Sequence, residues 1–203
     1  GINFFDTAAS YGNGASETNL GRALAGNKDG LVVSTKVGLA PNDMKNIGNT
    51  IAASLDASLA RLQLDHVDLF QFHNPIGLAD HRGLVTLETV LEEVLEAFER
   101  ARNAGKTRFI GFTAKGKPDD LVSLVQSERF DSAQIFYNLL VPSAGEAVPE
   151  DYPADDFKQL LSVLTSMSFL VVRAVWLDST TCYKAHVLLV LGLSPKHGKL
   201  AKV

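Results

Sequence analysis

Short apolar runs bounded by turn residues alternate along the chain with longer segments whose apolar residues recur every three or four positions. This alternation is typical of β/α units, and we count six of them. Most of the runs are continuously hydrophobic, which indicates a parallel sheet covered on both faces. The predicted strands are Ile2–Asp6, Leu31–Val37, Val67–His73, Arg108–Thr113, Ser132–Asn138 and Phe169–Trp176.

Leucine-rich stripes mark the segments between these strands as helices that pack on the sheet. The clearest are Thr50–Leu62 and a helix from about Leu87 to Asn103, and shorter ones are expected after Ser16, Asp119 and Asp155. The proline-rich segment Leu139–Asp156 predicts a long loop past a strand end, where barrel enzymes often place substrate loops. A plain linker is the alternative.

Alternating strands and helices fit either a doubly wound sheet or an eightfold barrel. An open dinucleotide-binding sheet is expected to carry a Gly-x-Gly-x-x-Gly turn after an early strand, and the sequence has none. Polar residues instead follow the ends of separate strands, as in barrel active sites: Asp6, Lys36, His73, Thr113 and Asn138. We therefore predict an α/β fold of the (β/α)8 TIM-barrel type with about six of its eight units. It forms a single domain over residues 1–203, with 177–203 left unassigned.

The composition of the chain excludes several classes of partner and location for such a domain. The chain is 46% hydrophobic with a net charge of −4, so it is neither disordered nor a basic binder of nucleic acid or anionic membranes. Its longest uncharged apolar stretch, Gln159 to Val172, is short of the roughly 20 residues that span a bilayer. The single cysteine, Cys182, excludes an intrachain disulfide. We expect a cytoplasmic protein, with no metal site because its histidines lack ligand spacing.

Four polar residues at the predicted strand ends have complementary acid-base chemistry. Lys36 interrupts an apolar strand, and a buried ammonium requires a carboxylate partner, for which Asp6 on the neighbouring strand is suited. A phenol near that ammonium is expected to have a lowered pKa, which predicts Tyr11 as a general acid. His73 is placed to hydrogen-bond a carbonyl oxygen.

These residues occur within four motifs that together resemble the aldo-keto reductase family over roughly Gly1 to Arg173. The motifs are Gly1-Ile2-Asn3-Phe4-Phe5-Asp6-Thr7-Ala8 with Tyr11-Gly12 and Ser16-Glu17, then Ser34-Thr35-Lys36, Phe72-His73-Asn74-Pro75, and Gly105-Lys106-x-Arg108-x-Ile110-Gly111.

The resemblance implies an NADP-dependent oxidoreductase that reduces an aldehyde or ketone by hydride transfer from NADPH. It implies a catalytic tetrad of Asp6, Tyr11, Lys36 and His73, with Tyr11 as the general acid. It also implies cofactor binding by Thr113, Gln134 and Arg173. The partner would be a small-molecule carbonyl or alcohol substrate.

Three features depart from the family pattern. The chain begins at what would be the second barrel strand, and Ala114 stands where many members have asparagine. After about residue 175 the sequence diverges, and the usual basic segment for the adenosine 2′-phosphate is not recognisable. Three alternatives therefore remain open: a catalytically silent fragment, a cofactor-binding sensor like potassium-channel β subunits, and a Schiff-base aldolase that uses Lys36.

Overall fold

The protein is built around one curved sheet whose strands follow one another in chain order. The computed structural model describes residues 3–25, 29–77, 85–137, 141–166, 170–174 and 188–191. Each strand pairs with the next, in parallel as far as β6, whereas β7 pairs antiparallel with β6. The strands are β1 (Phe4–Asp6), β2 (Val32–Val37), β3 (Val67–Phe72), β4 (Thr107–Thr113), β5 (Ser132–Phe136), β6 (Leu170–Ala174) and β7 (Leu188–Leu191).

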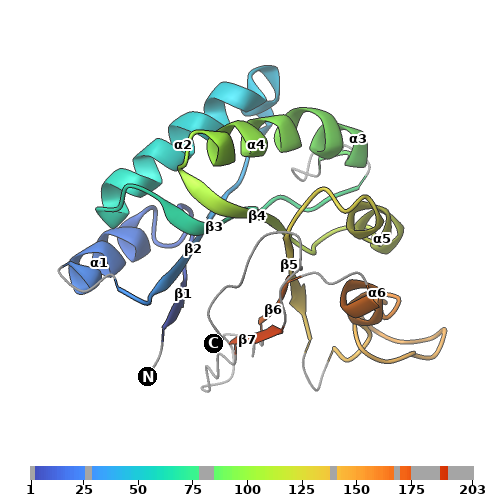
Figure 1. The fold of residues 1–203 in the computed structure, drawn as a ribbon. Helices are drawn as coiled ribbons and strands as arrows, with labels where there is room; N and C mark the ends of the chain where they lie inside the picture. The colour runs from blue at the N-terminus through green and yellow to red at the C-terminus, as the bar shows by residue number, and fades with distance from the viewer. Residues whose placement is uncertain are drawn as a thin grey trace.

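The larger helices lie in an arc outside this sheet (Figure 1). They are α1 (Ala15–Leu24), α2 (Ile47–Leu62), α4 (Leu95–Asn103), α5 (Pro118–Gln126) and α6 (Leu160–Ser166). Three shorter pieces complete the helical segments: the 3-10 helix η1 (Pro41–Lys45), the single turn α3 (Leu87–Thr89) and the π-helix η2 (Val90–Val94). Parallel strands with helices outside them form a partial (β/α)8 barrel, which confirms the predicted fold class.

The hydrophobic core lies between the sheet and the helices. All six residues of β2 and all six of β3 are buried, as the continuous apolar runs predicted. Aromatic rings join the layers: Phe70 of β3 stacks on Phe98 of α4 at 4.6 Å between centroids, and Phe130 packs against both Phe98 and Phe112. Burying each such side chain contributes about 1.5–3 kcal/mol, so the core fixes the strands whose ends carry the polar residues.

One expected helix begins later than predicted, and one strand was not predicted. The helix expected after Asp155 begins only at Leu160, because Lys158 and Gln159 have positive φ angles of 50° and 53° that no α-helix allows. The six predicted strands form a parallel sheet, as expected, and β7 in the segment left unassigned is an additional strand. There, the apolar run near residue 190 pairs antiparallel with the edge that β6 offers.

Candidate active site

Lys36 and Asp6 form an ion pair at the carboxyl ends of β2 and β1. The Lys36 ammonium donates to Asp6 Oδ2 at 2.7 Å, to the Thr7 carbonyl at 2.8 Å and to the Tyr11 hydroxyl at 3.5 Å. Its side chain is 1% exposed and that of Asp6 is 18% exposed. Burial lowers the pKa of Lys36, and the Asp6 carboxylate opposes that shift. The partner predicted from the sequence is confirmed.

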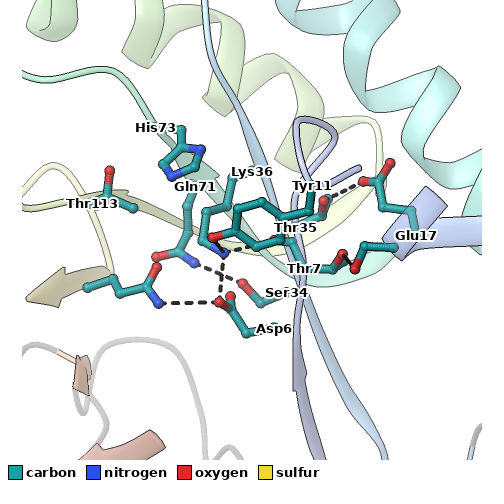
Figure 2. Close-up of polar contacts among 12 residues, drawn as sticks. Asp6, Thr7, Tyr11, Glu17, Ser34, Thr35, Lys36, Gln71, His73 and Thr113 are labelled. Atoms are coloured by element: carbon teal, nitrogen blue, oxygen red, sulfur yellow. Dashed lines mark hydrogen bonds and ion pairs between the residues drawn. The ribbon is translucent and has the colours of Figure 1, made fainter. Parts of the chain in front are cut away.

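Tyr11 reaches this pair from the loop between β1 and α1. The loop is closed by the Tyr11 carbonyl, which accepts from the Ser16 amide at 3.2 Å, and by Gly14, whose φ of 87° favours glycine at the start of α1. Figure 2 shows the Tyr11 hydroxyl directed toward the end of Lys36, with the His73 ring above the same lysine. The Tyr11 and His73 rings meet edge to face with centroids 6.0 Å apart.

The pKa of Tyr11 was expected to be lowered, and that expectation is wrong in direction. Burial, and secondly the negative charge of Asp6, raise the pKa of Tyr11 to about 12. The ammonium is 2.7 Å from Asp6 but 3.5 Å from the phenol, so most of its charge is balanced by the carboxylate. Tyr11 is therefore held in its protonated form, ready to give up a proton only to a stronger base.

His73 follows β3 and is held by its backbone. Its amide donates to the Val37 carbonyl at 2.8 Å, and the next residue, Asn74, exchanges hydrogen bonds with both backbone groups of Leu39. Burial, followed by the nearby charges of Lys115 and Lys36, lowers the pKa of His73 to about 4. The imidazole is therefore neutral near pH 7, with one N–H to donate and one nitrogen to accept.

A pocket opens beside these groups, and its lining joins the ends of three strands to the Tyr11 loop. It is lined by Tyr11, His73, Thr113, Lys115, Gln134, Ile135 and Phe136. Lys36 is not part of this lining, although its ammonium contacts the hydroxyl of Tyr11, which is. A lysine whose three N–H groups are already donated has no free electron pair, so the geometry does not favour Lys36 as a Schiff-base nucleophile.

Gln134 links the pocket to the ion pair. Its Nε2 donates to Asp6 Oδ2 at 3.3 Å, whereas its buried Oε1 has no hydrogen-bond partner among the described residues. Thr113 Oγ donates to the Phe72 carbonyl at 3.2 Å and keeps its acceptor capacity. A planar amide entering the pocket would find an acceptor oxygen in each of these side chains, so the pair fits the NH₂ group of a nicotinamide carboxamide.

Two predicted site residues fall beyond what the structure describes. Arg173 belongs to β6 and pairs with Ile135 and Leu189, but its side chain lies outside the described residues. Asn138 also lies outside them, together with the ends of the predicted strands Ser132–Asn138 and Phe169–Trp176.

Two features were not anticipated from the sequence. Lys115 lines the pocket with its Nζ 3.4 Å from His73 Nε2. Glu17 is fully buried, where it accepts from Thr35 Oγ1 and Arg61 Nε and so ties α1 to β2 and α2. Glu17 appears in the first motif, but only its position after the Tyr11 loop hinted at a role in bracing that loop.

A model of the aldo/keto reductase family matches residues 1–151 of the 203-residue chain. The chain belongs to the aldo/keto reductase family. The L-galactose dehydrogenase of Arabidopsis thaliana is 36% identical over 129 residues, which are 62% of this chain and 37% of that protein. The L-glyceraldehyde 3-phosphate reductase of Escherichia coli is 35% identical over 124 residues, 56% of this chain and 33% of that protein.

Solved reductase structures have the same fold. An aldo-keto reductase of Bacillus halodurans superposes with a TM-score of 0.65 at 24% identity, over 85% of this chain and 52% of that one. An aldo/keto reductase of Klebsiella pneumoniae in complex with NADP and acetate gives a TM-score of 0.60 at 26% identity, over 84% of this chain and 52% of that one. The chain thus spans about half the length of these structures, and less of the two matched relatives.

The described ranges contain no group of three His, Cys, Asp or Glu side chains that could hold a metal ion. No helix in these ranges is long and apolar enough to cross a membrane.

Proposed function

We propose that this chain carries the catalytic groups of an NADP(H)-dependent reductase of aldehydes or ketones. The observation that carries the proposal is the contact chain from Asp6 through Lys36 to the Tyr11 hydroxyl, at the rim of a pocket that His73 and Gln134 also line. The complexes of related Klebsiella pneumoniae reductases with NADP and NADPH support the choice of cofactor.

Gln134 and Thr113 would hold the carboxamide of the nicotinamide, because each offers an acceptor oxygen at the pocket wall. We assign Arg173 to the cofactor as well, on the family resemblance. When bound, the nicotinamide supplies a hydride for the carbonyl carbon.

Tyr11 gives the proton that the carbonyl oxygen needs once its carbon has been reduced. Its high pKa suits this step, because a developing alkoxide is a stronger base than a phenolate. As the proton leaves, the phenolate gains the attraction of the Lys36 ammonium 3.5 Å away. Asp6 keeps Lys36 charged and in place.

His73 polarises the carbonyl as a neutral imidazole. Because its pKa lies near 4, one ring nitrogen retains a hydrogen that is available to the carbonyl oxygen near pH 7. A charged imidazolium beside the ammonium of Lys36 would be repelled by it, so neutrality also stabilises the folded site.

The test combines cofactor binding with turnover. We expect NADPH fluorescence to change on titration with the chain and NADPH absorbance to fall when a small aldehyde is added. Tyr11→Phe is expected to reduce turnover by about 10²–10⁴-fold, the range for a lost general acid, with little change in NADPH affinity. Tyr152→Phe, a tyrosine outside the pocket lining, serves as the matched control.

Three results would contradict the proposal. Equal turnover in Tyr11→Phe would remove the mechanism. Binding without turnover would favour a sensor, a possibility supported by a 40% identity over 81 residues to a probable voltage-gated potassium channel subunit β of Arabidopsis thaliana. Absence of binding would favour a silent fragment.

A further inference from the structure

Lys115 gives the pocket a positive charge that the proposed chemistry does not use. Of the residues that line the pocket, Lys115 alone is charged near neutral pH, since Tyr11 and His73 are both neutral there. Its described contacts are with His73 Nε2 at 3.4 Å and with the face of the Phe136 ring at 5.8 Å. The charge therefore lies at the wall that faces the reacting groups.

No carboxylate within the described ranges neutralises this lysine. Asp6, the acidic group nearest to the tetrad, is already in its 2.7 Å ion pair with Lys36. The ion pairs of the described residues do not include Lys115. Burial alone lowers the pKa of Lys115, which reflects the cost of an ammonium without an acidic partner. A bound anion would remove that cost.

The backbone fixes where Lys115 stands. Its carbonyl accepts from the Ile76 amide at 2.8 Å, and the Ile76 carbonyl accepts from the Lys117 amide at 2.7 Å. Gly116 between the two lysines has a φ of 112°, and a Cβ there would collide with the backbone of Ile76. The turn after β4 is therefore clamped against the segment after β3, which keeps Lys115 beside His73.

We propose that Lys115 binds an anionic group of the substrate, so that the preferred substrates are carbonyl compounds with a carboxylate or phosphate one or two carbons from the carbonyl. The inference rests on the proposed reductase function. Because Lys115 Nζ lies 3.4 Å from His73 Nε2, an oxygen bound to the imidazole and one bound to the ammonium belong to neighbouring groups of a small molecule. A 2-oxo acid satisfies this geometry.

Anion binding also prepares His73. In the structure, Lys115 and the imidazole Nε2 are within hydrogen-bond distance, which occupies that nitrogen as an acceptor when the lysine is charged. A carboxylate offers the ammonium a stronger acceptor. His73 Nε2 is then free to take the tautomer with the ring hydrogen on Nε2, the Nδ1 hydrogen being lost to solvent as Nε2 gains one, and to donate a hydrogen bond to the carbonyl oxygen, whose proton still comes from Tyr11.

Pyruvate and methyl pyruvate are suitable probes, because they share the ketone and differ in the anionic charge. A charge-assisted hydrogen bond of about 1.5–3 kcal/mol corresponds to about 10- to 100-fold in binding. We expect Lys115→Met to lower the ratio of kcat/KM for pyruvate to that for methyl pyruvate by this factor, mainly through KM. Lys115→Arg is expected to retain the preference. Lys117→Met, which removes an exposed lysine two residues away, should leave the ratio unchanged.

The cofactor diphosphate is a second source of negative charge, and NADPH affinity distinguishes it. Under the proposal the NADPH Kd of Lys115→Met stays within about threefold of the wild-type value, far less than the expected change in the substrate ratio. A large rise in this Kd with an unchanged ratio for the two ketones would overturn the proposal and assign Lys115 to the cofactor.

A binding experiment without turnover separates this inference from the reductase proposal. The ring proton signal of His73, identified by its loss in His73→Gln, is followed by NMR as pyruvate is added. We expect a saturable shift with pyruvate in the wild type, and binding at least tenfold weaker both for pyruvate with Lys115→Met and for methyl pyruvate with the wild type. Equal titrations in the two proteins would overturn the anion site. A pyruvate-specific shift in a chain that never oxidises NADPH would support the site and overturn the reductase function.

Discussion

Replacing Lys36 with methionine tests whether the ion pair at the end of β2 behaves as a buried pair. The change keeps an unbranched apolar side chain as far as Cε and removes the ammonium from a position that is 1% exposed. Asp6 then loses its 2.7 Å partner and retains the Gln134 amide at 3.3 Å, while the Thr7 carbonyl loses its donor.

The expected loss follows from these contacts. Removing one partner of a buried pair costs about 3–5 kcal/mol, because the remaining charge is left without compensation. The Asp6 side chain is 18% exposed and keeps one hydrogen bond, which favours the lower end, about 3 kcal/mol. The double variant Asp6→Asn/Lys36→Met removes both charges, so we expect it to be more stable than Lys36→Met by about 2 kcal/mol.

Urea unfolding at pH 7, followed by far-ultraviolet circular dichroism, measures these differences. Lys45→Met is the control, since Lys45 is exposed on η1 and should change the free energy of unfolding by no more than about 0.5 kcal/mol. A loss below about 1 kcal/mol for Lys36→Met, or a double variant that loses the sum of the single losses, would refute a buried, coupled pair.

Three further predictions concern the groups around this pair. The His73 pKa of about 4 lies below the ordinary 6.5, so the unfolded chain binds more protons between these values and stability falls as the pH is lowered through this window. The full shift corresponds to about 3 kcal/mol, which solvent screening reduces to about 1–2 kcal/mol. Urea unfolding at pH 7 and 4.5 should show a smaller difference in the free energy of unfolding between the two pH values for His73→Gln than for the wild type. An equal difference in the two proteins would contradict the low pKa of His73. Asp6→Asn should lower the Tyr11 pKa from about 12 but keep it above 10, because burial is the larger cause of the shift. The Tyr11 pKa is measured from the pH dependence of tyrosinate absorbance, after subtraction of the absorbance of Tyr11→Phe. A pKa of 12 or more in Asp6→Asn would count against the Asp6 contribution. Arg61→Met should destabilise the fold by about 2–4 kcal/mol because it leaves the buried carboxylate of Glu17 without its cation, and a change below about 0.5 kcal/mol in thermal unfolding would disprove that role.

The sequence predicted the parts of the site that depend on chain order. Asp6, Lys36 and His73 follow successive strands, and parallel strands bring their carboxyl ends to one edge, so the periodicity alone brought these residues together. The same reasoning identified Asp6 as the partner of Lys36, because a buried ammonium has few alternatives.

What the sequence could not predict depends on burial and on loop positions. The Tyr11 pKa was expected to fall, but its direction is decided by how much solvent the fold removes and by the unequal distances from Lys36 to Asp6 and Tyr11. Lys115 lies on a turn with no periodic signal, and only the clamp between Ile76 and Gly116 brings it to the pocket. The antiparallel pairing of β7 likewise depends on the edge of β6.

Transfer of an isotopic label shows whether this chain moves a hydride from the cofactor to a carbonyl carbon. NADPH carrying deuterium at both C4 positions is incubated with the chain and a small aldehyde, and the alcohol is analysed by mass spectrometry. We expect one deuterium on the former carbonyl carbon with the wild type, and a rate of labelling about 10²–10⁴-fold lower with Tyr11→Phe. Alcohol without deuterium at that carbon, or equal labelling by both proteins, would contradict it.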